Sequence, residues 1–417
     1  MMLQRLIRAG SIWAIADQLI ASAGNFATML LVARSLAPSE FGTFVLILTA
    51  CMVVYGFHAN LIVSPLVVLG SNKSTGSART YLTTALVLTL ALLPVSGLVV
   101  FAACLSLHRG ITGTLAVLYI LAWQLQETTR RSLLSRLRFR DAIWGDSISY
   151  LGQVLILGFL TTRRRISLDE VFVVMAATSL AGLIVQAWQG RAACATRARL
   201  DLCATEFWDL GKWMVVASLA SLATGPIFPW LLNWFHGPQT VASYQAAMNV
   251  LGVANPIIVS IPTIVMPAAA LFIGNKVEPA RPLLKLAAKY TMQFEAILSP
   301  WFFILLFWPH NALVWFYGRT SAYACQTISV RIGILVYVLT VPMIVLGAVL
   351  TGSGRTKRNA AMQASGAVAS ILTGPPLIFA GGAIGAMLAE ALSRGVRVFL
   401  AIRMLYRPAA PASIEAS

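Results

Sequence analysis

Long apolar runs recur along the whole chain and are separated by short polar connections. A transmembrane helix needs about 20 mainly apolar residues to cross the hydrocarbon core of a bilayer. Runs of this length predict twelve spans, at residues 12–33, 41–69, 80–107, 111–129, 142–162, 170–190, 212–235, 241–273, 286–317, 328–351, 359–380 and 382–403. The pattern therefore predicts an all-α integral membrane protein.

Composition supports this fold class. Of the 417 residues, 58% are hydrophobic and 11% are charged, whereas a soluble domain carries about 25% charged residues. A soluble fold of this size could not hide so much apolar surface, because most ionisable residues of soluble proteins lie outside. The five cysteines show no C-x-x-C spacing, which favours small apolar side chains over disulfides or metal ligands.

Charge predicts the orientation in the membrane. The chain has 31 Lys and Arg against 14 Asp and Glu, a net charge of +17. In a membrane protein such an excess marks cytoplasmic loops and contacts with anionic lipids, so no nucleic-acid partner is expected. With both termini in the cytoplasm, most basic residues fall inside. The basic residues left outside are Arg34, Arg109, Arg163, Arg164, Arg165 and Arg319.

The longest polar connection divides the predicted spans into two groups of six. We expect an N-terminal six-helix lobe at 1–190, a cytoplasmic linker at 191–211, a C-terminal six-helix lobe at 212–407 and a short tail at 408–417. A shift of 200 residues aligns LAPSEFGTF (36–44) with HGPQTVASY (236–244), and a shift of 218 aligns RDA (140–142) with RNA (358–360). These echoes, in the same order in both halves, predict a duplicated bundle.

No motif indicates an enzyme. The sequence contains no H-E-x-x-H, no G-x-x-x-x-G-K-[ST], no G-x-S-x-G and no paired acidic cluster that could hold Mg²⁺. We therefore expect neither a catalytic residue nor a metal or other cofactor.

Polar residues inside predicted spans are costly and point to function. In the first span, Asp17, Ala21, Gly24 and Thr28 recur at i, i+4, i+7 and i+11 and form one helical stripe. Close helix packing explains the small residues but does not explain Asp17, for which a role in lining a cavity or coupling an ion stays open. Three further polar residues lie beside the stripe, Gln18, Ser22 and Asn25. We expect Gln18 and Asn25, with Asp17, to line a substrate cavity or to couple an ion.

The eighth span carries a similar stripe. Gln245, Asn249, Gly252 and Pro256 repeat the same spacing, and Asn255 is adjacent. Other intramembrane charges are Glu295, Arg331 and the pair Glu390 and Arg394. The last two are four residues apart, which predicts an ion pair within one helix. Coupling to H⁺ or Na⁺ and a purely structural role both stay open for these charges. The candidates for lining the substrate cavity or coupling an ion in this half are Gln245, Asn249, Asn255, Glu295 and Arg331.

The fourth span and its tail form the most distinctive charged stretch, WQLQETTRRSLLSRLRFRDAIWGD. Glu127 and Arg131 stand in the favourable i, i+4 order, and Arg130 lies between them in sequence. Guanidinium groups bind phosphate through two parallel hydrogen bonds. We expect Glu127, Arg130 and Arg131 to capture a pyrophosphate headgroup at the cytoplasmic mouth; the alternative is a basic anchor for anionic lipid.

Three stretches resemble a known family. ARSLAPSEFGTFVLIL, VASYQAAMNVLGVANPIIVSIPTIVMP, and GSGRTKRNAAMQ followed by FAGGAIGAMLAEALS are similar to the Wzx-like flippases. These form the polysaccharide-transporter branch of the multidrug/oligosaccharidyl-lipid/polysaccharide (MOP) exporter superfamily, which also contains the MATE transporters.

The resemblance implies a flippase of the bacterial inner membrane that works by alternating access. Its substrate would be a polyprenyl-pyrophosphate-linked oligosaccharide for exopolysaccharide, capsule or O-antigen. Its partners would be this lipid-linked glycan, membrane lipids and the polysaccharide polymerase or export machinery. Two alternatives stay open: a MATE-type multidrug or cation antiporter, and a non-transporting subunit of a polysaccharide biosynthesis complex.

Overall fold

The computed structural model describes residues 2–71, 75–191, 200–273 and 280–406. The predicted tail at 408–417 and part of the predicted linker, 192–199 with Cys194, lie outside these residues. Helices make up nearly all of the described chain, and no strand occurs within it. The predicted all-α fold class is confirmed.

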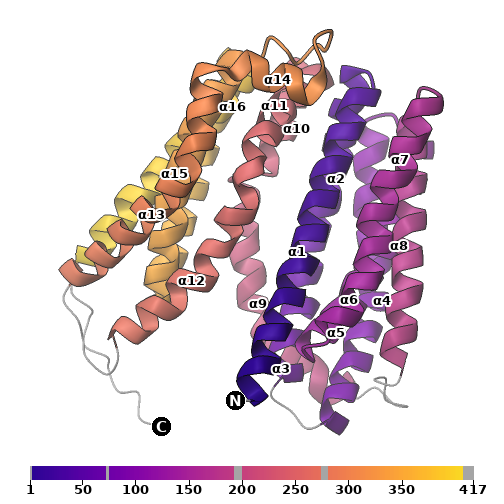
Figure 1. The fold of residues 1–417 in the computed structure, drawn as a ribbon, viewed down its shortest axis with the longest axis vertical. Helices are drawn as coiled ribbons and strands as arrows, with labels where there is room; N and C mark the ends of the chain where they lie inside the picture. Colours follow the sequence, from indigo (N-terminus) through magenta and orange to yellow (C-terminus); the bar gives the residue numbers. More distant parts are fainter. Residues whose placement is uncertain (1, 72–74, 192–199, 274–279, 407–417) are drawn as a thin grey trace. The chain divides into compact units, whose positions relative to one another are not determined.

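The helices follow one another with short connections (Figure 1). In the first part of the chain they are α1 (Met2–Ser35), α2 (Pro38–His58), η1 (Ala59–Val63), α3 (Ser64–Ser71), α4 (Thr75–Ser106), α5 (Gly110–Ser135), α6 (Phe139–Asp146), η2 (Ser147–Leu151), α7 (Gly152–Arg163), α8 (Leu168–Gly190) and α9 (Leu200–Leu222). In the second part they are α10 (Ile227–His236), α11 (Pro238–Leu251), η4 (Gly252–Ala254), α12 (Asn255–Ile273), α13 (Ala280–Phe307), α14 (Pro309–Tyr317), α15 (Thr327–Gly352) and α16 (Thr356–Tyr406).

Nine helical stretches among the described residues are long and apolar enough to cross a membrane. One of them, α16, consists of two helices joined at Gly382, whose φ of 50° breaks the helical geometry. The charged helix α5 is not among the nine, although residues 111–129 lie within it as a continuous helix. The exact number of twelve spans stays a prediction.

Two predicted spans differ from the structure at their ends. The span at 286–317 is wrong beyond residue 307, because α13 ends at Phe307 and Pro309 begins the separate helix α14. Proline lacks the N–H that would continue the preceding helix and is favoured in the first helical turn. The span at 212–235 is interrupted by a turn at 223–226 that separates α9 from α10.

The helices form two compact units, Met1–Leu219 and Ala220–Ser417. Residues 200–211 of the predicted linker are the first half of α9, which packs on the N-terminal unit. There Phe207 is buried in a cluster with Ile62, Leu66, Tyr81, Leu82 and Ala85, and Tyr81 donates a hydrogen bond to Glu206. The predicted limits of the lobes and linker stay predictions.

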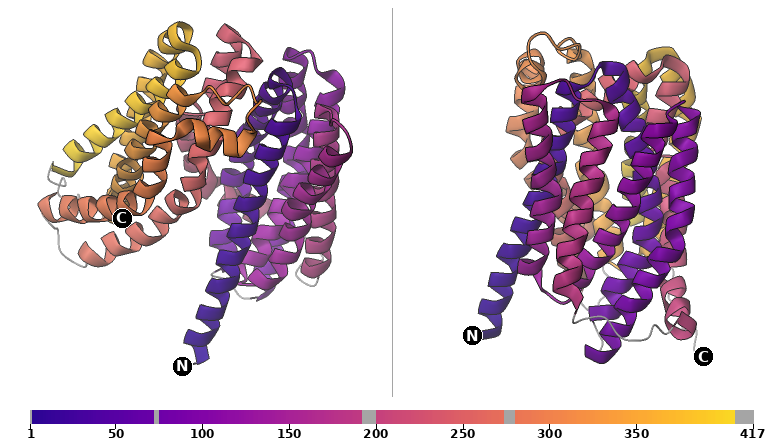
Figure 2. Two further views of the ribbon diagram at one scale, coloured as in Figure 1. Left: turned by 45° about the horizontal axis from the view of Figure 1, so that its top comes forward. Right: turned by 90° about the vertical axis from the view of Figure 1, so that its right-hand side faces the viewer.

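In the N-terminal unit, α5 packs along α4 and α8, and α1 packs on α6, η2 and α7. Figure 2 shows these long helices side by side. Ser167 caps α8 by accepting a hydrogen bond from the backbone of Glu170, whose side chain accepts one from the backbone of Ser167 in return. Because α5 also contacts α2 and α6, the middle of α5 has neighbouring helices on several sides.

In the C-terminal unit, α15 packs against α12, α13 and α16. The end of α16 is held by two arginines. Arg355 and Arg358 donate hydrogen bonds to the carbonyls of Leu405 and Met404, at 3.4 and 2.6 Å, which satisfies acceptors that a helix end leaves free. Burial lowers the pKa of Arg355, and the positive charge of Arg358 lowers it further.

Candidate functional site

The charged segment of α5 is buried, and Arg130 is its centre. The Arg130 side chain is 7% exposed. Its guanidinium lies 2.7 Å from the carboxylate of Asp17 on α1, 2.5 Å from that of Asp146 on α6, and 3.3 Å from that of Glu127 one turn earlier on α5. One cation therefore joins acidic groups from three helices.

Glu127 links this centre to a second arginine. Arg131 Nε lies 2.5 Å from Glu127 Oε1, which confirms the predicted i, i+4 pair. Tyr55 on α2 donates to the same carboxylate oxygen at 3.2 Å. The Arg131 side chain is 39% exposed, and among the described residues its two terminal nitrogens have no hydrogen-bond partner. Arg131 therefore keeps its two outer donors available.

Asp146 is held by α8 as well as by Arg130. Gln186 donates to Asp146 Oδ1 at 2.9 Å and to the carbonyl of Ala142 at 3.2 Å. The two helices approach closely here, because a Cβ placed on Gly182 would lie 2.9 Å from the carbonyl oxygen of Gly145. Glycine at these positions lets Gln186 reach the carboxylate.

We call Asp17, Glu127, Arg130, Arg131 and Asp146 the buried charge cluster. It contains three carboxylates and two guanidiniums. With every group ionised, one negative charge is left without a counterion. In addition, Asp17 Oδ1 is buried and accepts no hydrogen bond from the described residues. Uncompensated charge in a low-dielectric interior is costly, and one added positive charge would balance the formal charges of the cluster.

The polar stripe of α1 faces the inside of the unit. Asp17, Ala21, Gly24 and Thr28 are all buried. A Cβ on Gly24 would lie 2.6 Å from Cβ of Tyr150, so α1 and η2 nearly touch. Thr28 accepts a hydrogen bond from Gln153 at 2.9 Å. Close helix packing therefore accounts for the small residues of the stripe. Asp17 has a different environment, because it pairs with Arg130 in the buried charge cluster.

Gln18 and Asn25 are placed apart from this cluster. Both side chains are exposed, and Gln18 donates to Ser22 at 3.2 Å on its own helix. Their role in lining a substrate cavity or coupling an ion stays a prediction.

The candidate residues of the C-terminal unit do not form one site. Gln245 donates to Asn249 at 2.8 Å, Asn255 accepts from Tyr337 at 3.1 Å, and Arg331 donates to the carbonyl of Leu306 at 3.1 Å. These are separate contacts. Glu295 on α13 has a buried carboxylate oxygen with no hydrogen-bond partner among the described residues.

A second polar network holds α11, α15 and α16 together. Arg394 pairs with Glu390 at 2.8 Å, as predicted, and donates to Thr340 at 2.6 Å. Tyr244 donates to Glu390. The network contains one carboxylate and one guanidinium, so its charge is balanced and it fits a structural role.

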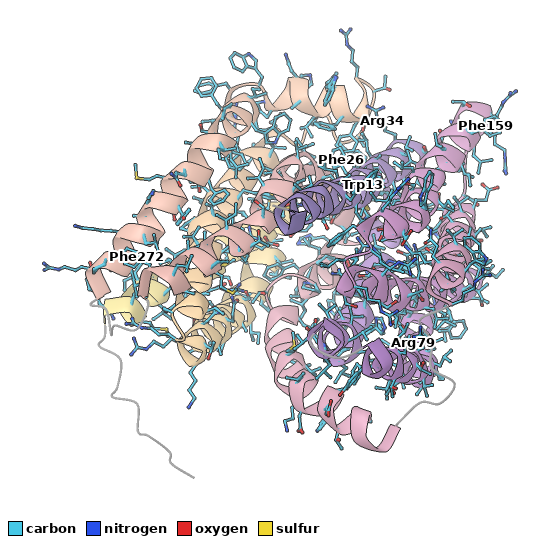
Figure 3. The ribbon with its side chains drawn as sticks, turned by 60° about the horizontal axis from the view of Figure 1, so that its bottom comes forward. Trp13, Phe26, Arg34, Arg79, Phe159 and Phe272 are labelled. Atoms are coloured by element: carbon cyan, nitrogen blue, oxygen red, sulfur yellow. The ribbon has the colours of Figure 1, made fainter. Side chains whose placement is uncertain are left out.

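The other basic residues near α5 have local partners. Arg138 pairs with Asp141 at 2.6 Å, and the guanidinium of Arg140 lies 5.9 Å from the ring of Trp13, labelled in Figure 3. At the end of α7, Arg163 lies 5.3 Å from the ring of Phe159. In the contacts of Arg140 and Arg163 a guanidinium lies over an aromatic ring, which is a cation–π interaction.

Sequence reasoning missed Asp146, Gln186 and Tyr55. Asp146 lies within the predicted span at 142–162, sixteen positions from Arg130, and a charged residue inside a predicted span was the available signal. Gln186 and Tyr55 are single polar residues in apolar helices, and only the tertiary structure brings them to the cluster.

No family model matches the chain, and no curated protein matches its sequence. Solved structures are similar across nearly the whole chain. An inward-facing multidrug-resistance MATE transporter of the MOP superfamily has a TM-score of 0.74 at 13% identity, covering 96% of this chain and 100% of that one. The lipid II flippase MurJ in an inward closed conformation has a TM-score of 0.67 at 14% identity, covering 96% and 87%.

A third similar structure is a MOP-superfamily transporter from Pyrococcus furiosus, noted for the reverse polarity of its binding pocket. It has a TM-score of 0.67 at 14% identity and covers 96% of this chain and 94% of that one. At these identities the likeness establishes the fold alone. The chain has the fold of multi-pass membrane transporters of the MOP superfamily.

Proposed function

We propose that the protein is a flippase that moves a polyprenyl-pyrophosphate-linked oligosaccharide from the inner to the outer leaflet of the bacterial inner membrane. The observation that carries this proposal is Arg131, the one partly exposed side chain of the buried charge cluster, whose two terminal nitrogens have no hydrogen-bond partner among the described residues. The fold, shared with the lipid II flippase MurJ and with MATE transporters, supports a transporter rather than an enzyme.

The pyrophosphate contact falls on Arg131 rather than on Arg130. The Arg130 side chain is 7% exposed and its guanidinium is occupied by carboxylates, so a phosphate could reach it only by displacing them. Arg131 uses Nε for Glu127 and can offer its two terminal nitrogens to one phosphate group. In this proposal Glu127 orients Arg131, and Arg130 holds the helices around it.

Replacing Arg131 by glutamine is expected to weaken binding of the lipid-linked substrate about tenfold or more, since a hydrogen bond to a charged group contributes about 1.5–3 kcal/mol. The measurement is a leaflet-accessibility assay in proteoliposomes that contain a fluorescent polyprenyl-pyrophosphate-oligosaccharide. Transport rate is recorded against substrate density for the wild type and the variant.

The matched control is Arg138→Gln, which removes a side chain of similar exposure whose partners are the carboxylate of Asp141 and the backbone carbonyl of Gln189. It should transport like the wild type. If Arg131→Gln transports normally, or if both variants lose activity equally, the proposal that Arg131 captures the phosphate is wrong. The arginine-rich segment would then act as a basic anchor for anionic lipid.

The buried charge cluster would couple transport to H⁺ or Na⁺. Its three carboxylates and two guanidiniums carry a net charge of −1 when all are ionised, which one added cation would neutralise. Asp17 Oδ1, which has no hydrogen-bond partner among the described residues, would receive that cation. Uptake of that charge would change how strongly α1 and α6 are attracted to α5. The coupling ion therefore acts on helix packing rather than on the cargo directly.

Replacing Asp146 by asparagine is expected to abolish the dependence of transport on an imposed ion gradient. The amide keeps an oxygen for Arg130 but removes the unbalanced negative charge. Transport is measured with a pH gradient, with a Na⁺ gradient and with neither. Asp141→Asn is the control, because this carboxylate is 35% exposed and lies outside the cluster. Unchanged gradient dependence in Asp146→Asn would contradict coupling at this site.

A MATE-type antiporter is the second candidate, favoured by the excess of buried carboxylate and by the similar MATE structures. It would exchange a cationic drug for an ion without binding pyrophosphate. Uptake of a fluorescent organic cation into the same proteoliposomes, insensitive to Arg131→Gln, would favour the antiporter over the flippase.

A further inference from the structure

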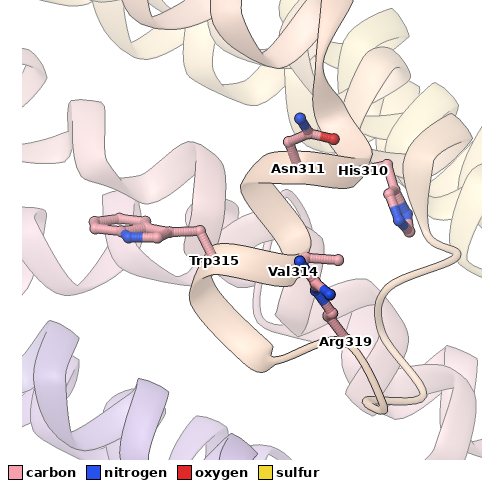
Figure 4. A pocket seen from close by; sticks show the side chains of 5 residues that line it. All are labelled: His310, Asn311, Val314, Trp315 and Arg319. Carbon is pink, nitrogen blue, oxygen red and sulfur yellow. The ribbon is translucent and has the colours of Figure 1, made fainter.

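The helix α14 presents one mixed polar and aromatic face. Its opposite face is buried through residues that include Leu313, Phe316 and Tyr317. The displayed face, together with the residue after the following turn, lines a cavity of about 550 Å³ (Figure 4). The lining residues are His310, Asn311, Val314, Trp315 and Arg319.

This segment is longer than a connection between two spans requires. Helices α4 and α5 of the N-terminal unit are joined by residues 107–109, whereas α13 and α15 are joined by 308–326. Most connections between packed elements are short, and longer ones with their own structure tend to carry function. Under the predicted orientation the residues after 317 lie on the outer side of the membrane, and α14 directly precedes them.

The cavity wall is held in place by contacts within the unit. His310 Nδ1 lies 3.0 Å from the carbonyl oxygen of Ala324. A carbonyl can only accept, so His310 Nδ1 is the donor of this hydrogen bond. Tyr317 donates to the carbonyl of Ala246 on α11 at 3.0 Å, and its ring packs 5.1 Å from that of Tyr323. The turn at Gly318 has a φ of 90°, which glycine adopts without strain and which leads to Arg319.

The exposed groups match the chemistry of a sugar. The Trp315 side chain is 72% exposed and offers an indole surface to the C–H face of a pyranose ring. Asn311 has both donor and acceptor atoms, and His310 Nε2 is the ring nitrogen not used by Ala324. Arg319 can donate to hydroxyls or to the carboxylate of an acidic sugar. A cavity of this volume is within the range of small-ligand sites.

We infer that this α14 cavity is a saccharide-binding site, which receives the glycan part of the cargo on the outer side of the membrane. The inference rests on the proposed flippase function for the origin of the glycan, but the binding itself does not require transport. Trp315 stacks on a sugar ring, while Asn311, Arg319 and His310 hydrogen-bond its rim.

The test measures binding of free saccharides to the full-length protein in neutral phosphatidylcholine nanodiscs, by saturation-transfer NMR and titration. The probes are maltotriose, N-acetylchitotriose and a hyaluronan tetrasaccharide, which offer hydroxyl, acetamide and carboxylate groups. At least one probe should bind to the wild type. Trp315→Ala and Arg319→Gln should each weaken that binding about tenfold.

Trp234→Ala is the matched control, because Trp234 on α10 is 84% exposed and does not line the cavity. It should bind the probes like the wild type. Binding of no probe, or equal binding by all variants, overturns the inference. It is also overturned if Trp315→Ala changes only the response to anionic lipid added to the nanodiscs, since α14 would then be a membrane anchor.

The same preparations separate this inference from the proposed function. If saccharides bind and Trp315→Ala weakens binding, but no lipid-linked substrate is transported, the site stands and the flippase proposal fails. If transport occurs without saccharide binding at α14, the flippase stands and the site is wrong.

Discussion

Replacing Arg130 by glutamine is expected to destabilise the N-terminal unit more than any other single change of charge. The substitution leaves the carboxylates of Asp17, Glu127 and Asp146 buried without their shared cation. Removing one partner of a buried ion pair costs about 3–5 kcal/mol, and here three partners lose it at once. The measurement is thermal unfolding of the detergent-purified protein, together with the yield of monodisperse material.

The matched control for this prediction is again Arg138→Gln, whose pair with Asp141 is partly exposed and should contribute less than about 1 kcal/mol. A second measurement adds Asp146→Asn to Arg130→Gln. Because the double change removes one of the unpaired charges, it should recover part of the lost stability. An Arg130→Gln protein as stable as Arg138→Gln would show that the buried charge cluster does not hold the helices together.

The fold class could be predicted from the sequence, because an apolar run of about 20 residues indicates a membrane-spanning helix. Helix ends were less certain where composition stays apolar across a break. The run at 286–317 shows this, since Trp308 and Pro309 end α13 while hydropathy remains high through Tyr317. The predicted span therefore included α14, the helix that lines the proposed saccharide site, and the sequence did not show it as a separate helix.

The candidate site was found in part. Asp17 was singled out as a charge within a predicted span, and Arg130 as part of the basic stretch that follows the fourth span. Their ion pair joins residues 113 positions apart, and no local pattern encodes such a distance. The pair of Glu127 and Arg131 was predictable because helical geometry places i and i+4 side by side. Asp146 was overlooked although it lies inside the predicted span at 142–162, where a charged residue is costly and points to function; that its partner is Arg130 could be seen only in the tertiary structure.

The polar stripe of α1 packs tightly against η2 at Gly24. Replacing Gly24 by valine is expected to separate α1 from η2, because even a Cβ at this position would lie 2.6 Å from Cβ of Tyr150 and 3.2 Å from its backbone carbonyl. Overpacking of a tight contact costs about 1–3 kcal/mol. The shift would also move Asp17, two turns earlier on the same face, away from Arg130. We expect a lower unfolding temperature and loss of transport in proteoliposomes.

Ala23→Val is the matched control, because Ala23 is exposed on the same helix and receives the same β-branched side chain. It should unfold and transport like the wild type, which removes any general effect of valine on α1. Adding Asp17→Asn to Gly24→Val distinguishes packing from charge. If α1 acts by holding Asp17 against Arg130, the second change costs little further stability once the helices have separated, whereas Asp17→Asn alone costs much more. Additive losses would mean that Gly24 and Asp17 stabilise α1 independently, and the stripe would then be a packing surface with no influence on the buried charge cluster.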